Sequence, residues 1–193
     1  MPGIDHFGLL APYYERFIHP PQDTDWPALL NLSHSQTILD VGGGTGRVAQ
    51  LISGNGHKVF VLDASLQMLA QAQVKGLLQS ACGLSERLPF PNQSFERILM
   101  VDAFHHLGNQ TASGQELWRI LQPGGRLVIE EPDIHQFSVK LIALGEKMML
   151  MRSHFWPAEK IVSLFKNLPC QVIISRKNGS VWIIVDRDPA VQG

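Results

Sequence analysis

The stretch Ile38-Leu39-Asp40-Val41-Gly42-Gly43-Gly44-Thr45-Gly46-Arg47 decides the fold of this chain. Its opening is apolar apart from Asp40, as in a buried strand, and the glycines that follow permit a sharp turn and a close approach to a ligand. Residues 47–53 then predict a helix, whose first amide groups favour negative charge. A strand joined to a helix in this way is typical of a nucleotide-type site at the carboxyl end of a strand in an open α/β sheet.

The spacing of the glycines narrows the choice of ligand. They fall at positions 42, 44 and 46, as G-x-G-x-G, and position 47 is an arginine. A dinucleotide site is expected to read G-x-G-x-x-G, so its third glycine is missing here. Asp40 is also poorly suited to a pyrophosphate and well suited to a cationic amine. Both features disfavour a nicotinamide cofactor.

A second acidic residue supports a ligand that contains a sugar. Residues 58–63 predict a second strand that ends at Asp63, which lies 19 residues after Gly44. A carboxylate in this place can accept hydrogen bonds from both ribose hydroxyls. The glycine turn would then hold one end of the ligand, and Asp63 would hold the sugar.

The rest of the chain continues the alternation of strands and helices. Ser65 is a good N-cap for a helix over 66–75, and Asn178-Gly179 predicts a hairpin between two apolar runs. Alternation of this kind predicts a parallel sheet covered on both faces. The further predicted strands are 37–41, 78–82, 97–102, 126–131, 171–175 and 181–186, and the further predicted helices are 26–32, 115–121, 136–151 and 157–167.

Composition excludes several classes of protein. The chain has 193 residues, 16 basic and 17 acidic side chains, and a net charge of −1, which disfavours a nucleic-acid binder or a polybasic membrane anchor. No apolar run approaches the roughly 20 residues of a membrane span. Cys82 and Cys170 form no disulfide scaffold, and no histidine pair has zinc-ligand spacing, so we expect no metal and a reducing, cytoplasmic setting.

Five ordered motifs resemble a known family. The chain resembles the class I S-adenosylmethionine (SAM)-dependent methyltransferases, in the small-molecule branch that includes the ubiquinone and menaquinone biosynthesis enzymes. The resemblance implies an α/β, Rossmann-like doubly wound sheet, mostly parallel with an antiparallel C-terminal hairpin, in the order 3-2-1-4-5-7-6. The stretches that carry it are 39–47, 61–69, 88–91, 94–107 and 121–132.

The resemblance also implies which residues bind SAM and its product S-adenosylhomocysteine. Asp63 corresponds to the ribose-binding acid, and Ala64 to a wall of the adenine site. The family often has an acid where this chain has Leu84, so adenine would be read by the backbone near Leu84 or by Ser85. The methionine end of the cofactor and its sulfonium would face Asp40, Gly42, Gly43, Gly44, Gly46, Asp102 and Ala103.

Candidates for catalysis follow the fourth predicted strand. His105 and His106 lie where a histidine could take a proton from the acceptor, although each also has a structural interpretation. Tyr14 matches a tyrosine of the family's N-terminal segment and could hold the methionine carboxylate or steer the acceptor. Glu130 and Glu131 are each interpreted as lining the substrate cavity or as facing solvent. Three methionines could cap a greasy substrate or form ordinary helix core: Met148, Met149 and Met151.

These features predict one methyltransferase domain over 1–193. Residues 1–35 would form an N-terminal helical lid, 36–132 the SAM-binding core, and 133–193 the cap helices and terminal hairpin. The expected activity is methyl transfer from SAM to a small, partly apolar acceptor, with no nucleic-acid partner and no signal for an oligomeric state. A non-catalytic SAM-binding protein and an NAD-dependent oxidoreductase are the alternatives.

Overall fold

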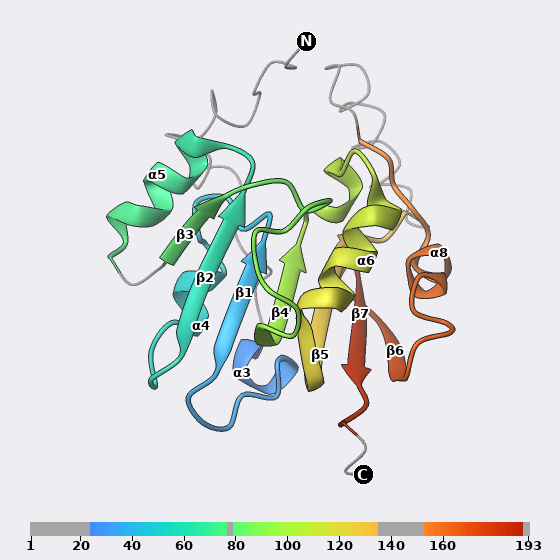
Figure 1. Cartoon of the computed structure of the whole chain (residues 1–193). Helices are drawn as coiled ribbons and strands as arrows, with labels where there is room; N and C mark the ends of the chain where they lie inside the picture. Colours follow the sequence, from blue (N-terminus) through green and yellow to red (C-terminus); the bar gives the residue numbers. More distant parts are fainter. Residues whose placement is uncertain (1–23, 77–78, 135–152, 191–193) are drawn as a thin grey trace.

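The chain folds around one seven-stranded sheet with the order β3-β2-β1-β4-β5-β7-β6 (Figure 1). This computed structural model describes residues 24–76, 79–134 and 153–190. The predicted fold class and strand order are confirmed. The strands are β1 (Thr37–Val41), β2 (Lys58–Asp63), β3 (Gln79–Cys82), β4 (Phe95–Val101), β5 (Leu121–Pro132), β6 (Cys170–Lys177) and β7 (Ser180–Arg187).

Five strands run parallel and place their carboxyl ends at one edge of the sheet. β1 pairs in parallel with β2 and with β4, so that Asp40 lies opposite Val61 on one side and Leu99 on the other. β2 pairs with β3, and β4 with β5, in the same sense. The edge at the carboxyl ends of β1 and β4, where the order of connections reverses, is the expected ligand edge of such a sheet.

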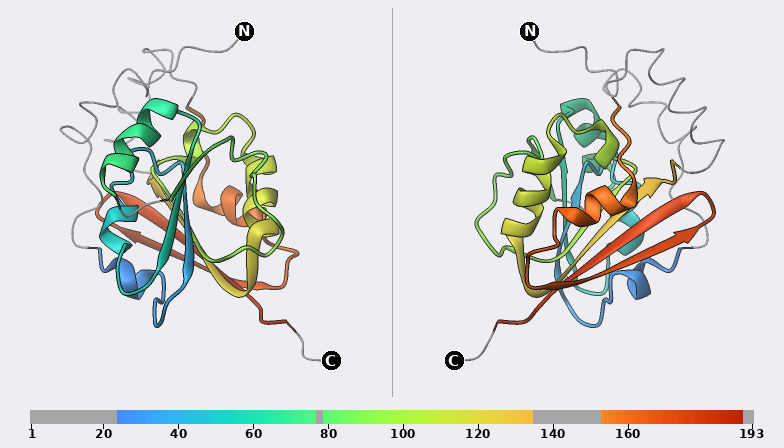
Figure 2. Two further views of the ribbon diagram at one scale, coloured as in Figure 1. Left: turned by 60° about the vertical axis from the view of Figure 1, so that its left-hand side comes forward. Right: turned by 90° about the vertical axis from the view of Figure 1, so that its right-hand side faces the viewer.

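Two layers of helix cover the sheet because its central strands are apolar on both faces (Figure 2). One core cluster packs α3, α4 and α5 against one face, and a second packs α6 and α8 against the other. Ser65 caps α5 by accepting from the Met68 N–H, as the sequence predicts. The helices are α3 (Trp26–Leu29), α4 (Ala49–Ile52), α5 (Leu66–Val74), α6 (Gln110–Ile120) and α8 (Ala158–Ser163), with a short 3-10 turn η1 (Phe104–His106).

The antiparallel end of the sheet is also confirmed. β7 pairs antiparallel with both β5 and β6. The turn between β6 and β7 has Asn178 at φ 53° and Gly179 at φ 87°, the left-handed pair that a two-residue hairpin needs.

Some element boundaries differ from those predicted. α4 begins two residues later than expected and lacks a side-chain cap, because the chain between Thr45 and Val48 continues as turns. α6 begins five residues earlier, because the Asn109 side chain accepts from the Ala112 N–H and caps it there. The predicted helix over 136–151 and most of the predicted N-terminal lid lie outside the described residues. Within the described residues, no helix has the length and apolar character needed to cross a membrane.

Candidate functional site

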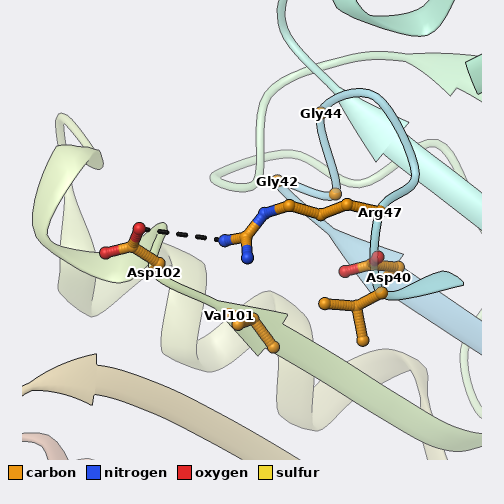
Figure 3. A pocket seen from close by; sticks show the side chains of 8 residues that line it. Asp40, Gly42, Gly44, Arg47, Val101 and Asp102 are labelled. Atoms are coloured by element: carbon orange, nitrogen blue, oxygen red, sulfur yellow. Dashed lines mark ion pairs between the residues drawn. The ribbon is translucent and has the colours of Figure 1, made fainter. Parts of the chain in front are cut away.

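A small pocket of about 20 Å³ lies at the carboxyl edge of the sheet, under the glycine turn (Figure 3). It joins the end of β1, the turn that follows it and the end of β4. The pocket therefore lies where the sequence placed the candidate ligand site. Its lining residues are Asp40, Gly42, Gly43, Gly44, Arg47, Val48, Val101 and Asp102.

Asp40 places a buried carboxylate against this pocket. Its neighbours Leu39 and Val41 belong to the core on the opposite face, so Asp40 takes a strand position that would otherwise be apolar. The side chain is 1% exposed, and within the described residues its Oδ2 atom has no hydrogen-bond partner. Burial raises the pKa of Asp40 to about 7, and the Arg47 guanidinium opposes this shift. An ammonium group would supply the missing donor, so the residue fits the amine that the sequence predicts.

The glycines of the turn are required by contacts on two sides. A Cβ at Gly43 would lie 2.6 Å from the Asp40 Cγ and 2.9 Å from the Val61 Cγ1. At Gly42, where φ is +70°, a Cβ would lie 2.7 Å from the Cβ of Ala103. Ala103 follows β4, so Gly42 is the point at which the turns after β1 and β4 touch.

The amide groups of these glycines are engaged within the protein. The Gly42 and Gly43 N–H groups both donate to the Leu62 carbonyl, at 2.7 and 3.2 Å. Gly44 donates to the Asp63 Oδ2 at 3.0 Å, and Gly46 donates to the Gly43 carbonyl at 2.8 Å. These bonds fold the turn back onto β2, and they use the donors that the sequence suggested for an anionic ligand.

Asp63 ends β2 and fixes the same turn. Besides the Gly44 N–H, it accepts the Ser65 N–H at 2.8 Å, and it remains partly exposed. A carboxylate has about four acceptor positions, so this one can hold the turn and also accept hydroxyl groups.

The residues predicted to surround adenine lie at the ends of β2 and β3. Ala64 is exposed, and Leu84 is 61% exposed, so both side chains can contact a ligand. Ser85 is buried, and its hydroxyl lies 2.9 Å from that of Ser113 in α6. The Ser85 hydroxyl therefore holds α6 in place.

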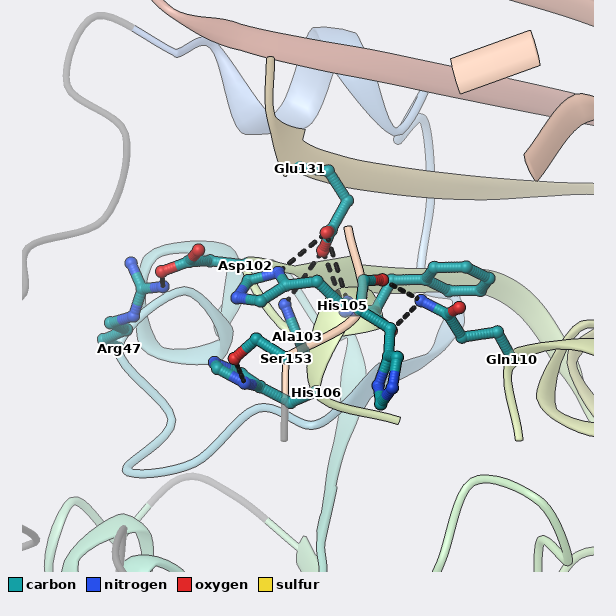
Figure 4. Close-up of polar contacts among 10 residues, drawn as sticks. Arg47, Asp102, Ala103, His105, His106, Gln110, Glu131 and Ser153 are labelled. Atoms are coloured by element: carbon teal, nitrogen blue, oxygen red, sulfur yellow. Dashed lines mark hydrogen bonds and ion pairs between the residues drawn. The ribbon is translucent and has the colours of Figure 1, made fainter. Parts of the chain in front are cut away.

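The turn after β4 is held by a single buried carboxylate, that of Glu131 (Figure 4). Its Oε1 accepts the N–H groups of Ala103 and Phe104, at 3.2 and 2.8 Å. Its Oε2 accepts the N–H and the Nδ1 of His105, at 3.2 and 2.7 Å. Glu130 and Glu131 are each 3% exposed, so the solvent-facing interpretation of both residues is wrong.

The two histidines differ from each other. His105 is 1% exposed, donates to Glu131, and stacks on Phe155 with a centroid distance of 4.3 Å. His106 lies 3.1 Å from the Ser153 hydroxyl. Burial, and next the neighbouring His105, lower the pKa of His106 to about 3. His106 is therefore neutral near pH 7, where a general base works best with a pKa close to the working pH. A base role for His105 stays a prediction.

Asp102 connects the two turns through charge. Its backbone has φ +54°, and its N–H donates to the Glu130 carbonyl at 3.0 Å. The Arg47 Nη2 lies 3.8 Å from the Asp102 Oδ2 (Figure 3). Arg47 is the site residue that the sequence interpretation missed, although its position directly after the glycine turn could have indicated it.

Some predicted site residues cannot be placed. Tyr14 and the three methionines lie outside the described residues. Within the described ranges, no group of three or more potential ligands is arranged to hold a metal ion.

Sequence comparisons find similarity to known methyltransferases. A sequence profile described as a methyltransferase domain matches residues 39–129. The chain is 36% identical over 110 residues to the ubiquinone/menaquinone biosynthesis C-methyltransferase UbiE of Coxiella burnetii, with 52% of this chain and 44% of that protein covered. The chain thus spans about half the length of the curated relatives it matches.

Solved structures share the fold. A SAM-dependent methyltransferase from Aquifex aeolicus superposes with a TM-score of 0.65 at 19% identity, covering 93% of this chain and 95% of that one. The [4+2]-cyclase SpnF superposes with a TM-score of 0.77 at 14% identity, covering 95% and 94%. Likeness at these identities shows the fold and leaves the reaction to be argued from the site.

Proposed function

We propose that this chain is a class I SAM-dependent methyltransferase that transfers a methyl group from SAM to a small acceptor. The observation that carries the proposal is the buried Asp40 carboxylate, whose Oδ2 has no hydrogen-bond partner among the described residues and which lines the pocket under the glycine turn. An unsatisfied buried carboxylate costs stability, and a cationic ligand offsets that cost.

Different residues around the pocket would bind different parts of the cofactor. SAM carries its methyl group on a sulfonium, and the neutral thioether of S-adenosylhomocysteine would be a good leaving group. Asp40 would accept from its ammonium group and Asp63 from its ribose hydroxyls. Ala64 and Leu84 would contact adenine, and Ala103 would form the wall beside the reacting centre. Their main contribution to rate is alignment of the two reactants and exclusion of water.

The acceptor is inferred from the relatives and from the candidate cap. The Coxiella burnetii relative is named as a C-methyltransferase of ubiquinone and menaquinone biosynthesis. We therefore propose a neutral, partly apolar ring compound of the phenol or quinol class. In this proposal, 1–35 and 133–193 flank the core of 36–132 within one domain, and the protein acts in the cytoplasm.

Titration calorimetry tests the cofactor first. Wild type should bind SAM and S-adenosylhomocysteine with micromolar affinity and should not bind NAD. Asp63→Ala should lose this binding, whereas Asp188→Ala, at an exposed aspartate, should keep it. Transfer of a labelled methyl group from SAM to a panel of phenols and quinols then tests the reaction.

Each alternative predicts a different result. Binding of SAM without transfer to any acceptor favours a non-catalytic SAM-binding protein. Binding of NAD favours an oxidoreductase. A folded protein that binds none of these ligands overturns the proposal.

A further inference from the structure

Turn η1 has its backbone N–H groups bound by one partner and its carbonyls bound by others. The Glu131 carboxylate accepts the N–H groups, as described above. The Phe104 carbonyl accepts from the Gln110 Nε2 at 2.9 Å, and the His105 carbonyl accepts from the His154 N–H at 2.7 Å. The turn directly follows the proposed wall beside the reacting centre, so its position bears on the reaction.

Gln110 joins this turn to a second segment of the chain (Figure 4). Its Nε2 also donates to the His154 carbonyl, at 2.8 Å and across 44 positions of the sequence. A side-chain amide has two N–H donors, so the two bonds use the full donor capacity of this residue. The Gln110 side chain is 5% exposed, and loss of either bond would leave a carbonyl without this donor in a largely dry place.

The start of α6 explains why Gln110 lies there. The Asn109 side chain accepts the Ala112 N–H at 3.0 Å and makes Gln110 the first residue of the helix. A residue in this position is close to η1 in the chain, and its side chain can reach back to the Phe104 carbonyl. The local cap therefore places a donor between the turn and the second segment.

Residues 153–156 lie along η1 in the reverse direction. Three side chains of the segment each contact a different residue of the turn: Ser153 with His106, Phe155 with His105, and Trp156 with Phe104. Trp156 is also held from α8, because the Lys160 Nζ lies 3.7 Å from the centroid of its ring. Phe155 and Trp156 remain partly exposed, so the joined segments offer aromatic surface that suits a partly apolar ring.

We propose that Gln110 is a positioning residue for methyl transfer: its two N–H donors hold turn η1 to residues 153–156 and thereby set where the acceptor lies relative to the methyl group of SAM. The inference rests on the function proposed above. Gln110 lies outside the set of residues that line the pocket under the glycine turn. Loss of its donors should therefore slow the transfer step and leave SAM binding nearly unchanged.

Hydrogen exchange followed by NMR tests the contact without any acceptor. Gln110→Met has a side chain of similar length and removes both donors. Exchange of the His154 N–H should become about tenfold faster, the range expected when supporting buried hydrogen bonds are lost. Exchange of the Lys58 N–H, which donates to the Gln36 carbonyl at the other edge of the sheet, should not change.

Kinetics and calorimetry separate positioning from binding. Gln110→Met should lower kcat about 10–100-fold, because a misplacement of about 1 Å is enough for a loss of this size. The Kd for SAM should change less than about threefold, since the cofactor contacts are kept. Gln110→Asn keeps the amide on a side chain one methylene shorter and should lose less of kcat, which also provides a folded variant if Gln110→Met does not fold.

Gln36→Met provides a matched control. Gln36 is 4% exposed and directly precedes β1, at the edge of the sheet away from the pocket. The same substitution of an equally buried amide should leave kcat and the exchange of the His154 N–H unchanged, even where it lowers stability. Each variant is assayed at a temperature at which it is fully folded.

The results that overturn the inference differ from those that overturn the function. Unchanged exchange at His154 in Gln110→Met would overturn the inference, whether or not an acceptor is found. Equal losses of kcat in Gln110→Met and Gln36→Met would show that Gln110 only stabilises the fold. A higher KM for the acceptor with kcat unchanged would also contradict a positioning role. Failure of wild type to transfer a methyl group to any acceptor would instead overturn the proposed function.

Discussion

The turns after β1 and β4 each lie against a buried carboxylate, and the two carboxylates differ in how fully they are hydrogen-bonded. Asp40, beneath the glycine turn, is 1% exposed and keeps an Oδ2 without a partner in the described structure. Glu131, beneath the turn after β4, is 3% exposed and accepts four N–H donors. The two carboxylates are buried to a similar extent but differ in their hydrogen bonding, which indicates that they have different roles. A satisfied carboxylate fixes the backbone, whereas an unsatisfied one is ready for a ligand.

The largest expected effect is a loss of stability when the hydrogen bonds of the Glu131 carboxylate are broken. Glu131→Gln replaces an acceptor oxygen by an NH₂ group that faces donors, and it leaves buried N–H groups unpaired. The free energy of unfolding should fall by about 3–4 kcal/mol, because breaking a buried charged network is costly. Urea denaturation measures it. The folded variant should lose less SAM affinity than Asp40→Asn does.

Glu159→Gln provides the control for Glu131→Gln. Glu159 is an exposed carboxylate that forms an ion pair with Arg176, and exposed pairs contribute less than about 1 kcal/mol. A loss at Glu131 as small as the loss at Glu159 would contradict the structural role of Glu131.

The next largest effect concerns Asp40, the carboxylate with an oxygen that lacks a partner in the described structure. Asp40→Asn should weaken SAM binding about 100-fold, near 2.7 kcal/mol, because the ammonium loses its counter-charge. The same variant should be more stable than wild type above pH 7, by roughly 1–3 kcal/mol. Burial raises the pKa of Asp40 from its ordinary value of 3.8 to about 7, so the folded state must release a proton that it holds more tightly than the unfolded state does.

The sign of this stability effect follows from the same shift. Between about pH 4 and pH 7 the folded protein binds the extra proton, so this group lowers stability progressively as pH rises through that window. Asparagine has no proton to lose. Urea denaturation at pH 5 and pH 8 should therefore show the gain for Asp40→Asn at pH 8, and a loss at both pH values would show that Asp40 is a structural residue.

The sequence predicts the strand order and much of the candidate ligand site around the glycine turn, because those features depend on local sequence patterns. The apolar run that ends at Asp40, the glycine spacing and Asp63 are read directly from adjacent residues. The cap at Ser65 and the hairpin at Asn178-Gly179 are equally local, and the structure confirms both.

The sequence does not reveal the contacts of Glu131 with the turn after β4, because the partners are distant in the chain. Glu131 meets the Ala103 and Phe104 N–H groups across 28 and 27 positions, and a pattern of residues cannot show which carboxylate a turn will face. The engagement of the glycine N–H groups by Leu62 is likewise a tertiary effect. The early start of α6 depends on Asn109, a local cap that the sequence interpretation overlooked.

A third prediction concerns the contact between the two turns. Gly42→Ala introduces a Cβ 2.7 Å from the Cβ of Ala103 at a backbone with φ +70°. The free energy of unfolding should fall by about 2 kcal/mol, of which about half is backbone strain. Ala103→Gly in the same chain should restore about 1 kcal/mol by removing the clash. Thermal unfolding of the four proteins measures the coupling, and strictly additive losses would mean that the turns do not touch there.

The smallest expected effect is the change in SAM affinity for each pH unit, which the unsatisfied Asp40 carboxylate should produce. Binding of an ammonium group needs Asp40 ionised, and burial raises the pKa of Asp40 to about 7. Affinity should therefore fall about tenfold for each pH unit below 7. Calorimetry between about pH 5 and pH 7.5 measures it, since α-amino groups begin to lose their own proton near pH 8.

A second carboxyl group could imitate this result, and the two can be separated. Burial also raises the pKa of Glu130 to about 7, and Glu130 acts on Arg47 as Asp40 does. If Asp40 controls binding, Asp40→Asn should bind weakly with little pH dependence, whereas Glu130→Gln should keep the tenfold slope. A slope that persists in Asp40→Asn and disappears in Glu130→Gln would assign the ammonium to Glu130. Two neighbouring residues of β5 would then have different roles, because Glu130 would bind the ligand and Glu131 would hold the turn after β4.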